Sequence, residues 1–75
     1  MAQTKIQLNK VDEVKELVYA AEKCDFDVDL SCGRIIVDAK SILGILSIGL
    51  NKTVMVQCHG DNDEFNYAIR KFAVA

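Results

Sequence analysis

Few side chains in this sequence could take part in chemistry, and His59 is the first to consider because it is the only histidine. An imidazole can accept a proton or a phosphoryl group, but a bound phosphoryl group needs cationic or hydrogen-bond-donating neighbours. The residues that follow are acidic instead, with carboxylates at Asp61, Asp63 and Glu64. Cys58 points to the opposite face of the same predicted strand. We therefore expect His59 to be a surface residue at a turn that forms no dyad with Cys58.

Cys24, Cys32 and Cys58 are the candidates for thiol chemistry or zinc binding. They contain no Cys-x-x-Cys pair, which zinc sites usually have, and an odd number argues against a framework of disulfides. Small apolar side chains are the simpler role for reduced cysteines. We expect no metal site and no cofactor at these residues.

The acidic run at residues 25–29 (DFDVD) begins like a calcium-binding loop. Such a loop requires glycine where this chain has Leu30 and a bidentate glutamate where it has Ile36. Alternation of acidic and apolar residues instead indicates a strand and the segment leading to it. The sequence also contains no nucleophile–base pair and no phosphate-binding loop, so an enzyme is not expected.

Ser41 precedes a very apolar segment, residues 42–48, that ends at Gly49. Serine is a good N-cap and glycine a good C-terminal stop, so this pattern predicts one short helix. A cap of this kind contributes about 1 kcal/mol. A phosphate at the same position would also be stabilised by the free amides and the helix dipole. The residues alone favour a plain cap, with a phosphorylation site as the alternative.

This short helix has more apolar residues than one buried stripe can hold. Ile45 and Ile48 are expected to face the sheet, together with either Leu46 or Ile42. The remaining side chains, among them Leu43, must then face outward, unless so short a helix can bury them all. A contiguous apolar patch on the surface of a small domain is typical of a protein–protein interface.

Length and composition place these candidates on one small folded domain, residues 1–75. The chain is 51% hydrophobic and 27% charged, which is ordinary for a globular protein. Its net charge of −2 gives no basic face for nucleic acid. No apolar run approaches the ~20 residues that cross a bilayer. Residues 1–10 lack the apolar core of a signal peptide, so a cytoplasmic location is expected.

Two periodicities predict the elements that must position these residues. Alternation of polar and apolar residues predicts strands, and apolar residues three and four positions apart predict helices. Four strands are expected, at residues 4–8, 27–31, 35–37 and 53–59. Three helices are expected, at residues 11–24, 42–48 and 65–72. The fold class is α+β in the order β-α-β-β-α-β-α: one four-stranded antiparallel sheet with three helices on one face gives every amphipathic element a common core.

That order, together with residues 39–49 (AKSILGILSIG), resembles the histidine-containing phosphocarrier (HPr) family of the sugar phosphotransferase system. In this family a Lys-Ser-hydrophobic segment with a following glycine opens the second helix. The resemblance implies an open-faced β-sandwich and a regulatory phosphorylation site at Ser41. It also implies that Ile42, Leu43 and Leu46 form a docking patch for partner proteins. The turn at residues 58–61 is similar to the glycine-acidic turn before the family's third helix.

The sequence departs from the family between the first strand and the first helix. There the family has a Gly-x-His-Ala-Arg-Pro-like signature, in which histidine takes the phosphoryl group and arginine steadies it. Counting back from Ser41 puts Lys10 near the histidine position and Asp12 near the arginine. No histidine, arginine or proline stands in this shortened connection. Asp12 and Glu13 complement the dipole of the following helix but would repel a phosphate.

We therefore expect an HPr-like protein that does not carry phosphate on histidine and acts as a regulatory or binding module through the Ser41 helix. The implied partners are proteins: phosphotransferase components, a kinase or a transcriptional regulator, with no nucleic acid and no membrane. A role in sugar transport would be inherited from the family. The alternative is a structural or small-molecule-sensing α/β domain that has left the phosphotransferase network.

Overall fold

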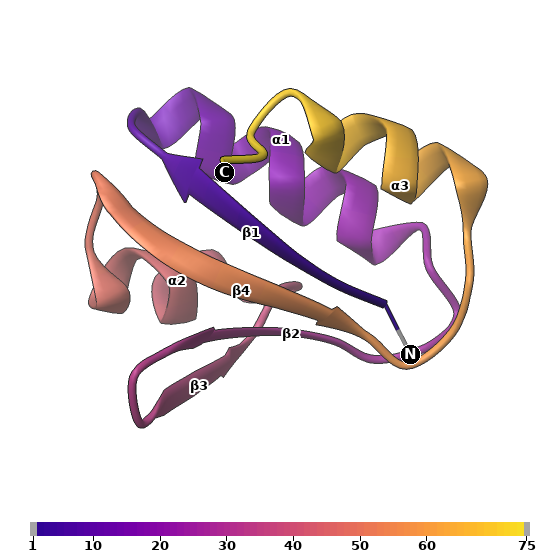
Figure 1. Cartoon of the computed structure of the whole chain (residues 1–75), viewed down its shortest axis with the longest axis horizontal. Helices are drawn as coiled ribbons and strands as arrows, with labels where there is room; N and C mark the ends of the chain where they lie inside the picture. The colour runs from indigo at the N-terminus through magenta and orange to yellow at the C-terminus, as the bar shows by residue number, and fades with distance from the viewer. Residues whose placement is uncertain (1, 75) are drawn as a thin grey trace.

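A computed structural model describes residues 2–74 as seven elements in the order β-α-β-β-α-β-α (Figure 1). The strands are β1 (Ala2–Leu8), β2 (Val28–Cys32), β3 (Ile35–Asp38) and β4 (Lys52–Cys58). The helices are α1 (Val11–Glu22), α2 (Ile42–Ile48) and α3 (Asp63–Arg70). The predicted order is confirmed. The first and last helices end two residues earlier than their apolar stripes, because Cys24 and Phe72 reach the core from the turns that follow.

The four strands form one antiparallel sheet in the order β1-β4-β2-β3. β4 is central, so that Val56 lies opposite Thr4 of β1 on one side and opposite Leu30 of β2 on the other. β2 and β3 are joined by a two-residue turn at Gly33 and Arg34. Gly33 has φ +61°, a left-handed conformation that glycine adopts without strain.

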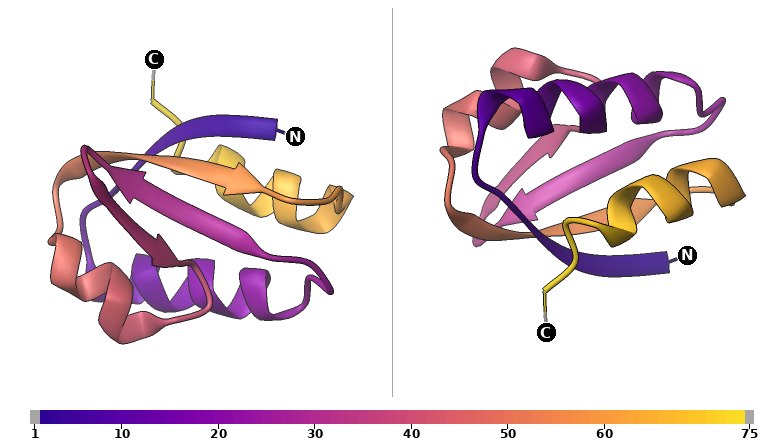
Figure 2. Two further views of the ribbon diagram at one scale, coloured as in Figure 1. Left: turned by 90° about the horizontal axis from the view of Figure 1, so that it is seen from below. Right: turned by 90° about the horizontal axis from the view of Figure 1, so that it is seen from above.

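The three helices cover one face of this sheet and leave the other face open (Figure 2). Residues along β4 alternate accordingly. Val54, Val56 and Cys58 are buried under the helices, whereas Met55 between them is only half-buried on the open face. The open-faced arrangement predicted from the two periodicities is confirmed.

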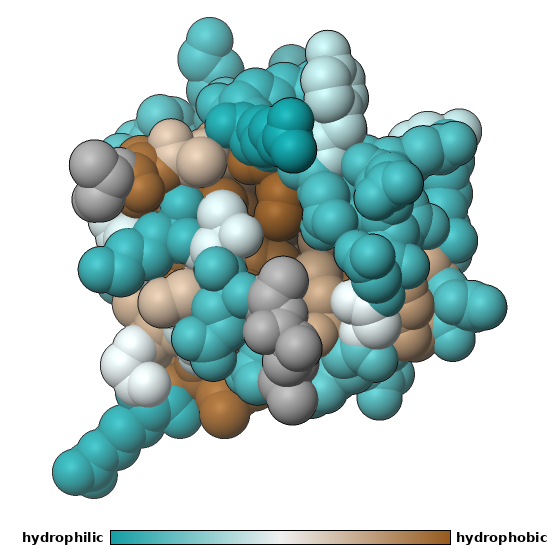
Figure 3. Space-filling view, turned by 45° about the vertical axis from the view of Figure 1, so that its right-hand side comes forward, coloured by the Kyte–Doolittle hydropathy of each residue, from teal (hydrophilic) through white to brown (hydrophobic). Residues whose placement is uncertain are grey.

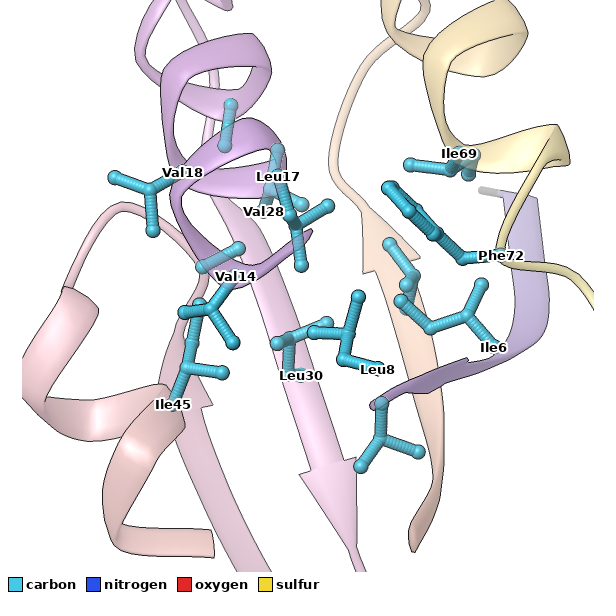
Figure 4. Close-up of a cluster of buried hydrophobic side chains, with 14 of the residues drawn as sticks. Ile6, Leu8, Val14, Leu17, Val18, Val28, Leu30, Ile45, Ile69 and Phe72 are labelled. Atoms are coloured by element: carbon cyan, nitrogen blue, oxygen red, sulfur yellow. The ribbon is translucent and has the colours of Figure 1, made fainter. Parts of the chain in front are cut away.

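The core between helices and sheet is apolar, and no side chain among the described residues is a buried polar or charged one. Its largest fully buried side chains are Phe65, Ile6, Leu17, Leu30, Val14, Val28 and Val56. In Figure 4, side chains of α1 and of the β2 strand meet in the middle of this layer, with Ile45 of α2 on one side and Ile69 on the other. The buried side chains of α2 that contact this core are Ile45 and Ile48, which lie on one face of the helix.

Hydrophilic residues cover most of the right half of the surface in Figure 3, and hydrophobic residues show in its middle and left parts. Among residues 2–74, no helix has the length and apolar character needed to span a membrane.

Candidate functional site

Ser41 caps the N-terminus of α2. Its backbone is extended, with φ −107° and ψ 109°, and its Oγ accepts the N–H of Gly44 at 3.1 Å. Gly44 allows α2 to pack closely against β3, because a Cβ at this position would lie only 3.3 Å from the Cβ of Val37. The helix ends at Gly49, whose φ of +103° few other residues adopt. The predicted cap and stop are confirmed.

The side chains of α2 divide between the core and the surface. Ile45 and Ile48 are 3% and 5% exposed, and Ile42 is half-buried against the same core. Leu43 is 78% exposed and Leu46 38%. Ile42, not Leu46, is therefore the third inward residue. The idea that so short a helix buries all its apolar residues is wrong.

Ile42, Leu43 and Leu46 form what we call the α2 patch. Both views of Figure 2 show α2 beside the first turns of α1. Val11, the first residue of α1, is also an exposed apolar side chain. Apolar surface thus gathers at the end of the helical layer where α1 begins.

The start of α1 holds a carboxylate of the chain itself. Lys10 is the N-cap residue, but its side chain has no acceptor atom and makes no capping hydrogen bond. Instead, the Oε1 of Glu13 accepts the backbone N–H of Asn9 at 2.7 Å and that of Lys10 at 3.2 Å. Asp12 adds a second carboxylate to the same turn. Two amides at this helix N-terminus are therefore already bound to an internal anion.

His59 has a partner that the sequence analysis missed. Its Nε2 lies 2.9 Å from the Oδ2 of Asp29, and both side chains are more than a third exposed. Asp29 is opposite Gln57 in the register of β2 and β4, so His59, two residues further on, is its diagonal neighbour on the open face. The prediction of a surface histidine that forms no dyad with Cys58 did not include this contact with Asp29. It is confirmed about exposure and about Cys58, which is buried on the other face.

His59 lies far from the start of α1. The ladder of β1 and β4 pairs Leu8 with Lys52 at one end and Ala2 with Cys58 at the other. Six residues of strand at about 3.4 Å each separate these ends by roughly 20 Å. His59 therefore cannot replace a histidine at Lys10.

The cysteines are unsuited to thiolate chemistry. Cys24 and Cys58 are buried, Cys32 is half-buried, and all three are free thiols. Burial raises the pKa of the Cys24 thiol, against a smaller opposing effect of Lys40. Burial, with the proximity of Cys24, likewise raises the pKa of the Cys58 thiol. Within residues 2–74, no three His, Cys, Asp or Glu side chains lie together as metal ligands would.

A shallow groove of about 220 Å³ lies between α1 and α3. Its lining includes Tyr19, Ala20, Phe65 and Ala68. This volume is below the ~300 Å³ at which small-molecule pockets usually begin. Two more open hollows on α3, of about 490 and 410 Å³, share Tyr67 and Arg70 in their lining. Volume therefore does not decide between a small-molecule sensor and a protein-binding module.

Comparison with known proteins gives a family and a fold. The family model described as the PTS HPr component phosphorylation site matches residues 11–73. No curated protein sequence matches the chain. The chain is similar to the crystal structure of HPr-C-His from Thermoanaerobacter tengcongensis, with a TM-score of 0.78, 24% identity, and 95% of this chain and 89% of that chain covered. It is also similar to a phosphocarrier protein HPr from Bacillus anthracis str. Ames, with a TM-score of 0.74, 21% identity, and coverage of 97% and 96%.

Proposed function

Since the chain belongs to the HPr family, whose model it matches over residues 11–73, we propose that it is a member that binds partner proteins through α2 without carrying phosphate on a histidine. The exposure of Leu43 and Leu46 on a helix otherwise anchored in the core is the observation that carries this proposal. The partners are protein components of the phosphotransferase system, or a kinase or transcriptional regulator linked to it. The protein would act in the cytoplasm, as a binding or regulatory module and not as an enzyme.

Burial of the α2 patch by a partner would supply enough binding free energy for a transient protein–protein interface. Each aliphatic side chain that passes from water into an interface contributes about 1.5–3 kcal/mol. Two or three such residues can therefore form the centre of a specific but transient interface. Leu43 would contribute most, because it has the most surface left to bury.

Three features support the absence of phosphocarrier chemistry. The stretch at residues 9–13 contains no histidine or arginine. The Glu13 carboxylate accepts the N–H groups of Asn9 and Lys10, so a phosphoryl group there would meet an anion instead of free donors. His59 lies roughly 20 Å away along the sheet.

Partner binding is tested by calorimetric titration of purified phosphotransferase components and regulators from the source organism. We expect Leu43→Glu to abolish any binding observed with the parent protein. Tyr67→Glu is the matched control, because it adds the same charge at a site on α3 of nearly equal exposure, 73% against 78%. Loss of binding in both variants, or in neither, would contradict the proposed surface, as would the failure of every candidate to bind the parent.

Carrier activity is tested by incubation with phosphoenolpyruvate and the general phosphotransferase enzyme that phosphorylates HPr. We expect no acid-labile phosphate on this chain. Lys10→His alone should not restore transfer, because Asp12 and Glu13 remain and the supporting arginine is absent. Efficient transfer to the parent or to this variant would show that the start of α1 tolerates a phosphoryl group after all.

Ser41 is proposed as the regulatory phosphorylation site, on the basis of the family resemblance of residues 39–49 and its position beside the α2 patch. Its Oγ would have to give up the Gly44 amide, a cost of about 1 kcal/mol that the dianion regains from the same amides. The added charge would then alter docking at Leu43. Incubation with ATP and a kinase that acts on HPr serine should label the parent and not Ser41→Ala. Label that persists in Ser41→Ala would contradict this assignment.

A further inference from the structure

The two edges of the sheet differ. The outer edge of β1 is covered by the C-terminal segment, where Gln7 donates its N–H to the carbonyl of Phe72 at 2.9 Å and Val74 donates to Lys5 at 3.0 Å. β3 forms the opposite edge, and no element within residues 2–74 pairs with its outer side (Figure 1). An uncovered edge strand is a template for pairing with another strand.

β3 is also apolar for an edge strand. Ile35 is 51% exposed and Ile36 69%. Their side chains point to opposite faces of the sheet, because successive residues of a strand alternate. Charges on natural edge strands discourage pairing with unrelated strands, and at β3 they stand only at the two ends, at Arg34 and Asp38.

The backbone groups available at this edge follow from the ladder with β2. Ala39 donates its N–H to the carbonyl of Val28 at 2.8 Å. Since hydrogen-bonded pairs alternate in an antiparallel ladder, Val37 also bonds toward β2. The N–H and C=O of Ile36 and the N–H of Asp38 therefore point outward. The carbonyl of Asp38 is already used, because it accepts the N–H of Ser41 at 3.0 Å.

We propose that β3 pairs with β3 of a second copy of this chain, antiparallel and two-fold symmetric about Ile36, to join two sheets edge to edge. In this register Ile36 lies opposite its own counterpart, and the two residues exchange both backbone hydrogen bonds. Ile35 lies opposite Val37, which brings apolar side chains together on the helical side. A symmetric dimer requires a surface that complements itself, and this strand meets that requirement.

Charge favours this occupant over an unrelated strand. Arg34 lies two residues before Ile36, and Asp38 lies two residues after it. In the proposed register each Arg34 therefore lies opposite Asp38 of the other copy. Both side chains are exposed, and neither has an ion-pair partner among the described residues. Asp38 uses Oδ1 to accept the N–H of Lys40 at 2.8 Å, which leaves Oδ2 to receive a guanidinium. Symmetry makes two such ion pairs per dimer.

The association should be weak. One pair of short strands buries far less than the ~1,200 Å² at which stable interfaces begin. We therefore expect a dimer that is absent at low micromolar concentration and populated near millimolar concentration. Sedimentation equilibrium across that range measures it, and NMR on the same samples should locate the shifting amide signals at β3.

Charge reversal tests the register. Arg34→Asp and Asp38→Arg should each weaken self-association at least tenfold, because each places like charges opposite one another. An equimolar mixture of the two variants should associate at least as well as the parent, since all four charges are then complementary. The double variant should also recover the parent's association. Lys15→Asp on the exposed face of α1 is the control and should change nothing.

Further measurements keep the proposal falsifiable. Thermal unfolding of each variant checks that the domain remains folded, because Asp38→Arg removes the carboxylate that accepts the N–H of Lys40. The NMR spectra of the variants at low concentration check β3 itself. Ile36→Pro removes an outward N–H without breaking a bond to β2 and should also reduce association. A monomer at every concentration overturns the proposal. So does a dimer that the single charge reversals leave unchanged, or one in which the amide shifts lie away from β3.

Discussion

A charge placed at two positions of α2, one facing in and one facing out, should have opposite consequences for stability. Ile45 is 3% exposed and lies in the apolar core, whereas Leu43 is 78% exposed. Ile45→Glu removes about 1.5–3 kcal/mol of burial. It also buries a carboxyl group among residues that include no polar side chain to pair with it.

The free-energy cost of burying that carboxyl group follows from the shift in pKa that burial causes. Full burial raises the pKa of a glutamate by up to about 3–5 units, and each unit corresponds to about 1.36 kcal/mol. At pH 7 the ionisation cost cannot exceed the interval between pH 7 and the unfolded pKa of about 4.3, so it adds roughly 3–4 kcal/mol to the loss at Ile45. Burying the carboxyl without a hydrogen-bond partner costs about 1–3 kcal/mol more. A domain of 75 residues is stable by roughly 4–11 kcal/mol in total, so Ile45→Glu should be largely unfolded. Leu43→Glu should stay within about 0.5 kcal/mol of the parent.

Urea denaturation followed by circular dichroism measures both variants. The pH dependence identifies the cause in Ile45→Glu. A carboxyl whose pKa is raised by folding adds no ionisation cost below its unfolded pKa of about 4.3 and costs stability increasingly as the pH rises above it. This variant should therefore be more folded at pH 4 than at pH 7. Ile45→Glu within about 1 kcal/mol of the parent, or unfolding of Leu43→Glu, would refute the assignment of the two faces.

Two further predictions concern the core. Gly60→Ala should lower the free energy of unfolding by about 1–3 kcal/mol, because the new Cβ would lie 2.4 Å from the Phe26 ring; the shift of the urea midpoint measures it. Cys24 and Cys58 have pKa values raised above the ordinary 9.0 by burial, so the folded state keeps protons that the unfolded state releases. Stability should therefore be unaffected by these thiols below about pH 8 and fall as the pH rises through 9 and beyond. Replacing both cysteines by alanine should flatten this fall, and an unchanged slope would contradict it.

Much of the fold could be predicted because its signals are local. Alternation along residues 53–59 and the spacing of apolar residues in α1 each report a single element, and both were read correctly. The ends of the helices are not local in the same way. α1 stops at Glu22 although Cys24 continues its apolar spacing, since a side chain in the following turn can still reach the core.

The site was only partly predictable, because some of its contacts join distant segments. Ser41 and Gly49 could be recognised as a cap and a stop from their types alone. The side-chain contact of His59 with Asp29 spans thirty residues and depends on the register of β4 against β2. Nothing in the residues next to His59 indicates that register.

Residue types and their spacing are enough to predict the order of the elements, the inward direction of Ile45 and Ile48, and the lack of a histidine before α1. These follow from residue types and from periods of two and 3.6 residues, which act within one element. The rotation of α2, which turns Ile42 inward and leaves Leu46 exposed, depends on how the helix packs in three dimensions. The tertiary structure also decides that the C-terminal segment covers β1 and leaves β3 open, because edges, registers and helix rotation depend on which distant segments pack together.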